Sequence, residues 1–375
     1  MIYVVIFILS LILYHYLLFP LILYLLSFVS TRAYEKVSNE SSTVSFIVAA
    51  LNEEKVIRQK IENCLEIDYP IDKIQFIFVL DGSTDGSYEI VKSHEHLGFI
   101  CLHDPQRRGK TAAINRAMEI ASGDVVVFSD ANSMFDRNAI KNLLQNLSDE
   151  TIGGVCGRKG IVSNDDRASS RGDSFYWNIE SVIKMLQSKI GSISTGDGEI
   201  FALRRKLYQK MPENIINDDT AITFDIINAG YRVVYEPSAV TYEEASLTLK
   251  DDFNVKVRMV AGGYQTLQIY SQLLFTKVPL FGIQFISHKV LRWFMPVLLI
   301  LLLVSNIFVL DQRLLLYFFV LQLFFYFSAF MGHLTKFKIL YFPLYYVVMN
   351  IAALFGLIKF LRGDMGIKIW KKAQR

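Results

Sequence analysis

Residues 75–85 read QFIFVLDGSTD, a short apolar and aromatic run that ends in a polar turn. Such a run is typical of a buried strand followed by a loop. Two further stretches repeat the arrangement, since residues 43–54 read TVSFIVAALNEE and residues 125–132 read VVVFSDAN. The expected elements are strands at 43–49, 75–80, 98–102 and 125–128, and helices at 55–66 and 110–121. Strand, helix, strand repetition predicts an α/β fold with a mostly parallel sheet flanked by helices.

Polar residues directly follow three of these strands. Asn52 and Glu53 follow the first strand, Asp81 begins the turn after the second, and Asp130 and Asn132 follow the last. Each group alone has an ordinary explanation, because acids and amides are common in turns and at helix starts. In parallel sheets, however, ligands bind at the carboxyl ends of the strands. The three groups together therefore predict a binding site along one edge of the sheet.

Uncharged segments near both ends explain the high content of hydrophobic residues, which is 52%. Residues 1–31 contain no Lys, Arg, Asp or Glu, and at about 1.5 Å per residue they are long enough to cross a hydrocarbon core of about 30 Å. A signal peptide is the alternative, but the charged start and the small-residue cleavage site are missing. Three further runs of spanning length lie at 293–310, 314–332 and 339–358. The shorter apolar run between Lys277 and His288 suits a helix lying on the membrane surface.

These segments divide the chain into five regions. We expect a transmembrane helix at 1–31, an α/β domain at 40–248, interfacial helices at 249–290, transmembrane helices at 291–361 and a basic tail at 362–375. Arg32 and Lys36 favour a cytosolic position for the α/β domain, by the positive-inside rule. The tail conflicts with this layout, because three C-terminal spans would put Lys368, Lys371, Lys372 and Arg375 on the opposite side. A net charge of only +3 gives no indication of a nucleic-acid partner.

Seven short motifs mark the middle of the chain: 49–53 (AALNE), 80–85 (LDGSTD), 108–115 (RGKTAAIN), 129–132 (SDAN), 196–205 (GDGEIFALRR), 217–219 (NDD) and 229–237 (AGYRVVYEP). With these motifs the chain resembles, over residues 43–265, the inverting glycosyltransferase family 2, and especially its membrane-bound branch of cellulose, chitin, hyaluronan and poly-N-acetylglucosamine synthases. The resemblance implies a GT-A fold, a UDP-sugar donor and a glycan or lipid-linked acceptor. It also implies a multi-pass protein of the cell membrane, in contact with lipid, with its catalytic domain in the cytosol.

The resemblance includes a divalent metal ion as cofactor. Negative charge grows on the leaving diphosphate during sugar transfer, and a bound cation stabilises that charge. The resemblance places the cation at Asp130 and Asn132, where Mg²⁺ or Mn²⁺ would find the oxygen ligands that it prefers. The family usually has two aspartates here, so Asn132 keeps an oxygen ligand but lacks the charge.

The resemblance also assigns residues to the nucleotide. Asp81 and Glu53 correspond to residues that bind uracil and ribose, and Lys110 stands at a helix start, where phosphates are favoured. Arg258 corresponds to an arginine that contacts the diphosphate, a role that suits a guanidinium group. The other motif residues assigned to the donor site are Ala49, Asn52, Asp130 and Gly198.

An inverting transfer in one step needs a carboxylate that accepts the proton of the acceptor hydroxyl. Its pKa should be raised towards the working pH. Asp218 and Asp219 are the candidates, and the resemblance favours Asp219 as the base. Two adjacent like charges would raise one of the two pKa values. The alternative is an ordinary helix start rich in acids.

One departure from the family concerns the length of the product. Processive members carry Q-x-x-R-W before the interfacial helix, whereas residues 255–259 read VKVRM, with Arg258 but without Gln and Trp. Met259 cannot offer the flat ring on which a sugar stacks. Three functions are therefore compatible with the sequence: polysaccharide synthesis, addition of one sugar to a lipid-linked acceptor, and an inactive membrane scaffold or transport component. The intact Asp81, Asp130 and Asp219 argue against the last of these.

Overall fold

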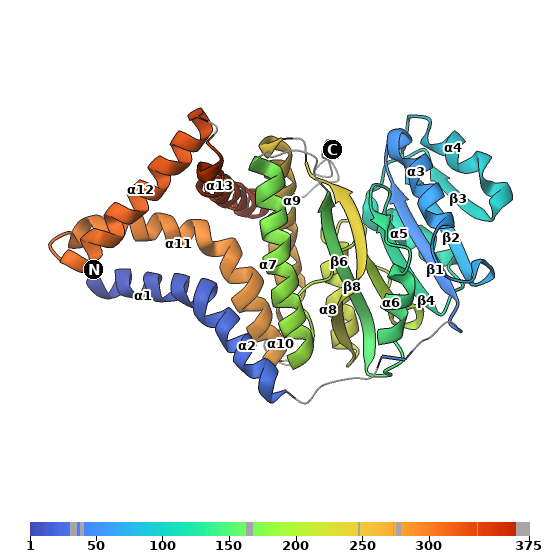
Figure 1. Cartoon of the computed structure of the whole chain (residues 1–375), viewed down its shortest axis with the longest axis horizontal. Coiled ribbons are helices and arrows are strands. Elements are labelled where there is room, and N and C mark those ends of the chain that lie inside the picture. The colour runs from blue at the N-terminus through green and yellow to red at the C-terminus, as the bar shows by residue number, and fades with distance from the viewer. Residues whose placement is uncertain are drawn as a thin grey trace.

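The structure is a computed structural model that describes residues 1–30, 36–37, 41–162, 168–246, 248–272, 274, 279–335 and 337–364. Figure 1 shows two parts, a sheet with helices on its faces at the right and a group of long helices at the left. Between the two parts stand α7 (Ala168–Ile190) and α9 (Leu249–Ile269).

Among the described residues, eight strands form one mixed sheet in the order β3-β2-β1-β4-β7-β6-β8-β5. β3, β2, β1 and β4 are parallel, as are β6 and β8, whereas β7 and β5 pair antiparallel with their neighbours. The strands are β1 (Val44–Ala50), β2 (Ile74–Asp81), β3 (Phe99–Asp104), β4 (Val125–Asp130), β5 (Met134–Phe135), β6 (Ile152–Val162), β7 (Phe201–Arg204) and β8 (Arg232–Glu244). The four strands expected from the sequence are β1 to β4, and their parallel pairing is confirmed.

Helices cover both faces of the sheet because its central strands are apolar on both sides. In β1, Phe46 belongs to a core cluster with α3 (Glu54–Leu65) and α6 (Ala139–Asn146), and the next residue, Ile47, belongs to a cluster with α5 (Lys110–Ile120) and α8 (Asp218–Asn228). The shorter helices are α4 (Ser87–Ser93), η2 (Ile71–Lys73), η3 (Glu95–Leu97) and η4 (Arg205–Leu207). The expected helices at 55–66 and 110–121 correspond to α3 and α5.

Four helices or unbroken helix groups are long and apolar enough to cross a membrane: Ile2–Val29, Leu280–Val309, Arg313–Thr335 and Lys338–Leu361. Their elements are α1 (Ile2–Leu13), η1 (Tyr14–Leu18), α2 (Phe19–Val29), α10 (Pro279–Phe285), η6 (Ile286–Val290), α11 (Leu291–Asn306), η7 (Ile307–Val309), α12 (Arg313–Thr335), η8 (Lys338–Leu340) and α13 (Tyr341–Leu361). One N-terminal and three C-terminal apolar helices were expected, and all four are present. Most of the expected basic tail, residues 365–375, lies outside the described residues.

The apolar run between Lys277 and His288 differs from the expectation of a separate surface helix. It continues through η6 into α11, so its described residues begin the candidate span Leu280–Val309. The polar residues at the end of the run, His288 and Lys289, are buried against Glu180 of α7. Lys289 forms an ion pair with this carboxylate, and Nε2 of His288 lies 3.3 Å from it. Because Glu180 compensates for these groups, the helix passes through them without a break.

The start of this span is also packed into the core of the α/β domain. The rings of Phe281 and Phe285 lie 5.1 and 5.0 Å from the ring of Phe224 in α8, centroid to centroid. These aromatic contacts fix the membrane part to the helix whose first residues are Asp218 and Asp219.

Candidate active site

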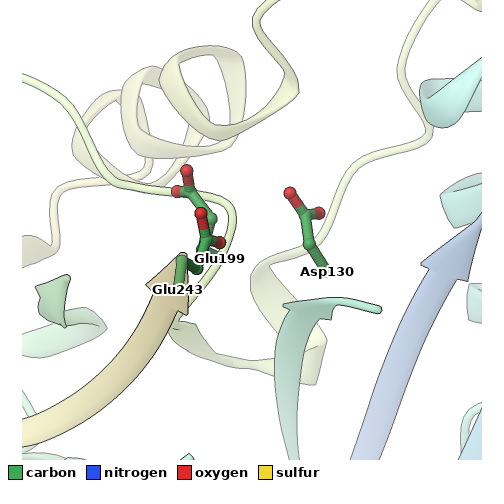
Figure 2. A group of neighbouring side chains, drawn as sticks. All are labelled: Asp130, Glu199 and Glu243. Carbon is green, nitrogen blue, oxygen red and sulfur yellow. The ribbon is translucent and has the colours of Figure 1, made fainter. Parts of the chain in front are cut away.

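Three carboxylates from separate parts of the sequence meet at one edge of the sheet. Asp130 ends β4, Glu243 lies near the end of β8, and Glu199 stands in the loop before β7. Their nearest carboxylate oxygens all lie within 4.8 Å of one another (Figure 2). Oxygen ligands in such a group suit a hard divalent cation. Asn132, in the turn two residues beyond Asp130, is half-buried.

Two lysines compensate the charge of these carboxylates. Lys110 Nζ lies 2.7 Å from Asp130, and Lys159 Nζ lies 2.8 Å from both Glu199 and Glu243. Burial opposes the charge on Lys110, but Asp130 and Asp218 together outweigh burial and raise the pKa of this lysine. Burial also raises the pKa of Asp130, in spite of Lys110. The site is therefore a dense set of paired charges that are buried or half-buried, which is common where chemistry takes place.

Asp218 and Asp219 begin α8 on the other side of Lys110. Lys110 Nζ lies 3.9 Å from Asp218, and the backbone N–H of Gly198 donates to Asp219 at 3.3 Å. Burial, together with the charges of Asp218 and Glu199, raises the pKa of Asp219 to about 7. A carboxylate with this pKa can accept a proton at neutral pH and is a candidate general base.

Arg258 approaches the same group from α9. Burial lowers its pKa, whereas the charges of Asp130, Asp218, Glu199 and Asp219 act to raise it. An arginine keeps its charge under these conditions. Arg258 therefore brings a fixed positive charge to the acidic group.

The loops after β1 and β2 are joined by reciprocal hydrogen bonds. The backbone N–H of Asn52 donates to Ser83, and the Asn52 side chain accepts from the backbone N–H of Thr84 at 2.8 Å. The backbone N–H of Glu53 donates to the hydroxyl of Ser87 at 2.9 Å. Asn52 and Glu53 thus hold the two loops together as one rim of the sheet edge.

Asp81 is fully buried and anchors a third loop. Its carboxylate accepts from the backbone N–H groups of Arg108 and Gly109, at 3.1 and 2.6 Å, and from Arg116 at 3.2 Å. Gly109 has a φ of +105°, a conformation that favours glycine. The next residue is Lys110, so Asp81 fixes the start of the helix whose lysine reaches Asp130.

The structure brings most of the residues expected from the sequence together. The side chains of Lys110, Asp130, Asp218, Asp219 and Arg258 converge, with the backbone of Gly198 beside Asp219. Ala49 is the β1 neighbour of Asp130 in the sheet register. Asn52 and Glu53 stand on the adjoining loop after β1. Asp81, the last residue of β2, is linked to this group through Gly109 and Lys110.

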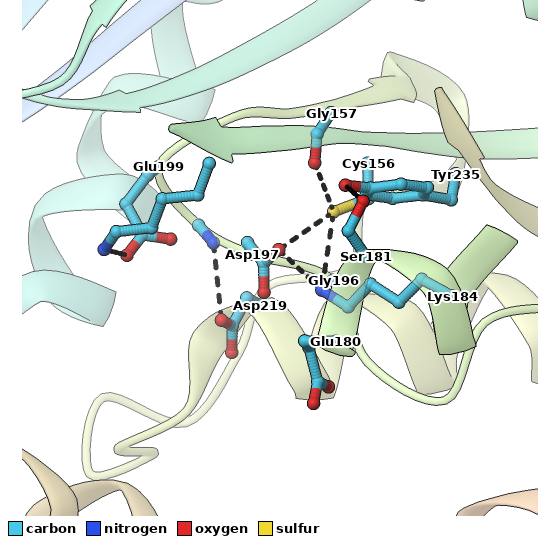
Figure 3. Close-up of polar contacts among 12 residues, drawn as sticks. Cys156, Gly157, Glu180, Ser181, Lys184, Gly196, Asp197, Glu199, Asp219 and Tyr235 are labelled. Atoms are coloured by element: carbon cyan, nitrogen blue, oxygen red, sulfur yellow. Dashed lines mark hydrogen bonds and ion pairs between the residues drawn. The ribbon is translucent and has the colours of Figure 1, made fainter. Parts of the chain in front are cut away.

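Sequence reasoning did not single out Glu199, Glu243, Lys159 or Lys184. Glu199 lies inside the GDGEIFALRR motif, so the motif was the available signal. Lys159 and Glu243 lie on neighbouring parallel strands, β6 and β8, and reach the site only through the strand pairing. Lys184 of α7 donates a hydrogen bond to the carboxylate of Asp197 at 2.5 Å (Figure 3). Asp197 lies in the same loop as Gly198 and Glu199.

The architecture is of the GT-A type. A mannosyltransferase from Pyrobaculum calidifontis, solved in complex with GDP-Man and Mn²⁺, matches the fold with a TM-score of 0.72 and 22% sequence identity. The match covers 96% of this chain and 99% of the mannosyltransferase. The sequence model of glycosyl transferase family 2 matches residues 45–211. This chain therefore contains a glycosyl transferase family 2 domain.

Curated relatives extend the similarity towards the membrane part. Poly-beta-1,6-N-acetyl-D-glucosamine synthase of Staphylococcus aureus (strain COL) is 28% identical over 271 residues, which is 70% of this chain and 65% of that protein. A probable glycosyltransferase of Bacillus subtilis (strain 168), YdaM, is 28% identical over 248 residues, 62% of this chain and 58% of its own length. The match thus spans less than two thirds of the length of either relative.

Proposed function

We propose that this protein is a membrane-embedded inverting glycosyltransferase that transfers a sugar from a UDP-sugar to a growing polysaccharide or another glycan acceptor. The observation that carries the proposal is the pair Asp218 and Asp219 beside three clustered carboxylates, with the pKa of Asp219 at about 7. A scaffold gains nothing from keeping a proton acceptor in this environment. The relation to a polysaccharide synthase supports a glycan acceptor.

Asp219 is the base in this proposal. Its carboxylate accepts the proton of the acceptor hydroxyl while the hydroxyl oxygen bonds to the anomeric carbon and the bond from that carbon to the diphosphate breaks. Asp218 raises the pKa of Asp219, and the fixed hydrogen bond from Gly198 orients its carboxylate. The attack comes from the side opposite the leaving group, so the configuration at the sugar carbon is inverted.

Two positive side chains and the group of clustered carboxylates are assigned to the diphosphate of the donor. Lys110 and Arg258 stabilise the negative charge of the leaving group. Asp130 with Asn132, joined by Glu199 and Glu243, would hold Mg²⁺ or Mn²⁺ through oxygen atoms. A bound cation of this kind neutralises charge on the phosphate oxygens.

The uridine side is formed by the rim of loops after β1 and β2. Ala49, Asn52 and Glu53 line this side, and the structure supports a mainly positioning role for Asp81, whose oxygens hold the Arg108–Gly109 backbone. In this proposal residues 40–248 are the catalytic domain, on the cytosolic side, where nucleotide sugars are made. The acceptor, or the lipid that carries it, approaches from the adjoining membrane.

A panel of labelled UDP-sugars tests this function. The purified full-length protein, in lipid nanodiscs with Mn²⁺ or Mg²⁺, is expected to hydrolyse or transfer one donor and to stop on addition of EDTA. Silence with every donor would support an inactive scaffold. Sizing of the product on a gel then distinguishes a polymer from the addition of one sugar. Met259, which stands where processive members of the family carry tryptophan, favours the addition of one sugar.

A further inference from the structure

The last apolar helix, α13, contacts α7 of the catalytic domain near its start and α9, the helix that follows this domain, near its end. Close to its start, the ring of Phe342 lies 5.6 Å from that of Phe175 in α7. Close to its end, the ring of Phe360 lies 5.6 Å from that of Tyr264 in α9. The contacts are tight, since a Cβ at Gly172 of α7 would lie 2.4 Å from the ring of Tyr345.

The two helices in these contacts, α7 and α9, belong to the catalytic side. α7 carries Lys184, which binds Asp197 in the active-site loop. α9 carries Arg258, and its Met259 carbonyl accepts a hydrogen bond from Asn217, at the start of α8. Neither α7 nor α9 is among the four candidate spans of the described chain.

The geometry of a crossing helix does not allow these two contacts at once. From Phe342 to Phe360 the helix rises about 27 Å at about 1.5 Å per residue, close to the hydrocarbon thickness of about 30 Å. If α13 crossed the bilayer, one of these two residues would lie on the face away from the catalytic domain. Phe175 and Tyr264 could then not both be its neighbours.

The apolar helices α1 and α11 are arranged differently from α13. Val5 and Ile8 of α1 form a cluster with Leu302 of α11 and Leu315 of α12, away from the sheet. In Figure 1, α1 and α11 run leftwards from the foot of α7, whereas α13 is seen foreshortened beside α7 and α9. α1 and α11 thus extend away from the catalytic domain, and α13 remains along it.

We infer that α13 does not cross the bilayer but lies along the lipid leaflet on the side of the catalytic domain. Its partner is the lipid surface, because the apolar side chains of Ile351, Phe355 and Leu361 expose 44%, 51% and 72% of their area. Basic residues stand at both of its ends, Lys338 at the start and Arg362 at the finish. In a helix that lies flat on the membrane, the basic residues at both ends can contact the headgroups of the lipids.

This arrangement resolves the conflict between the basic tail and the positive-inside rule. With three crossings, at Ile2–Val29, Leu280–Val309 and Arg313–Thr335, the chain after α13 stays on the side of the catalytic domain. The tail residues Lys368 and Lys371 then follow the positive-inside rule together with Lys36. The inference depends on the membrane layout alone and not on the proposed reaction.

Cysteine labelling in sealed membrane vesicles of known orientation tests the inference. Single cysteines replace Lys371 in the tail, Glu95 in the catalytic domain and Gln312 in the turn after α11, in the full chain with its three native cysteines changed to alanine. A membrane-impermeant maleimide is expected to label Lys371→Cys and Glu95→Cys from the same side and Gln312→Cys from the other. Labelling of Lys371→Cys together with Gln312→Cys would overturn the inference.

A protease-cleavable tag after Arg375 gives the same readout in the chain with its native cysteines, should the alanine background not fold. Spin labels at Ile351, Phe355 and Arg362, which lie on one exposed face of the helix, then measure depth in the bilayer. A helix lying flat places the three labels at equal, shallow depth. A label that is deep at Ile351 and becomes steadily shallower towards Arg362, over about 16 Å of helix, would show a crossing helix and refute the inference.

Discussion

Replacement of Asp219 by Asn gives the sharpest test of the proposed base. The side chains are nearly equal in size, but the amide cannot accept the proton. Loss of a positioned general base costs about 10²- to 10⁴-fold in rate. We therefore expect Asp219→Asn to lower transfer by a factor in this range and to bind UDP with nearly unchanged affinity.

The same substitution should make the protein more stable at neutral pH. The pKa of Asp219 rises from 3.8 to about 7 in the folded protein, a difference of about 3 pH units at about 1.4 kcal/mol each. The folded state therefore binds the proton more tightly than the unfolded state, and stability falls as pH rises from 3.8 to 7. At pH 8 the ionised carboxylate costs up to about 4 kcal/mol, and the neutral amide removes this cost.

The assay combines two measurements on the full-length protein. Transfer of the labelled donor is followed from pH 5.5 to pH 9, and the wild-type rate should rise tenfold per pH unit below about pH 7 and then level off. The unfolding midpoint is measured at pH 8 in EDTA. Asp225→Asn is the matched control, because Asp225 lies on the same helix but bonds to Tyr270 away from the site.

Three results would contradict the reasoning. Unchanged turnover of Asp219→Asn would remove Asp219 as the base. A lower unfolding midpoint of this variant at pH 8 would show that the charged carboxylate is stabilising, contrary to its raised pKa. An equal loss of rate in Asp225→Asn would point to a general disturbance of α8.

Three more predictions concern the charges around the site. Asp130→Ala should weaken Mn²⁺-dependent UDP binding in calorimetry, because it removes one of the three clustered carboxylates. Lys159→Met leaves Glu199 and Glu243 without their buried lysine and should lower the free energy of unfolding by about 3–5 kcal/mol in EDTA, with partial recovery on addition of Mn²⁺. Gly109→Ala forces a side chain into a φ of +105° and should cost about 1–3 kcal/mol and weaken donor binding by displacing Lys110.

Each of these three has a control. Asp136→Ala removes a half-buried turn carboxylate near Asp130 in sequence, and an equal loss of UDP binding there would move the metal site elsewhere. Lys210→Met breaks the exposed pair with Glu119 and should cost less than about 1 kcal/mol; a similar loss in both lysine variants would contradict the role of burial. Gly98→Ala also has a positive φ, so it should lose stability but keep donor binding.

The α/β character and half of the site were readable from the sequence because they depend on local order. Each parallel strand ends where its apolar run ends, so the position of Asp130 at the sheet edge followed from the run VVVFSD. Asp218 and Asp219 were identified from the short motif NDD at 217–219, because such a motif consists of consecutive residues. The four apolar helices were found for the same reason, since length and lack of charge are properties of consecutive residues.

The sequence by itself determined which residues form strands, which segments are apolar, and which short motifs carry acids. Only the tertiary structure decided that Glu199, Glu243 and Lys159 join Asp130, because a loop and two strands that lie far from Asp130 in the sequence bring them there. Only the structure showed that the helix continues through His288 and Lys289 because both contact Glu180. A buried charge is tolerated when a residue far away in the sequence lies beside it and compensates its charge. The path of α13 was likewise invisible in its composition, because an apolar helix has the same sequence whether it crosses the lipid or lies on it, and only its contacts at both ends distinguish the two.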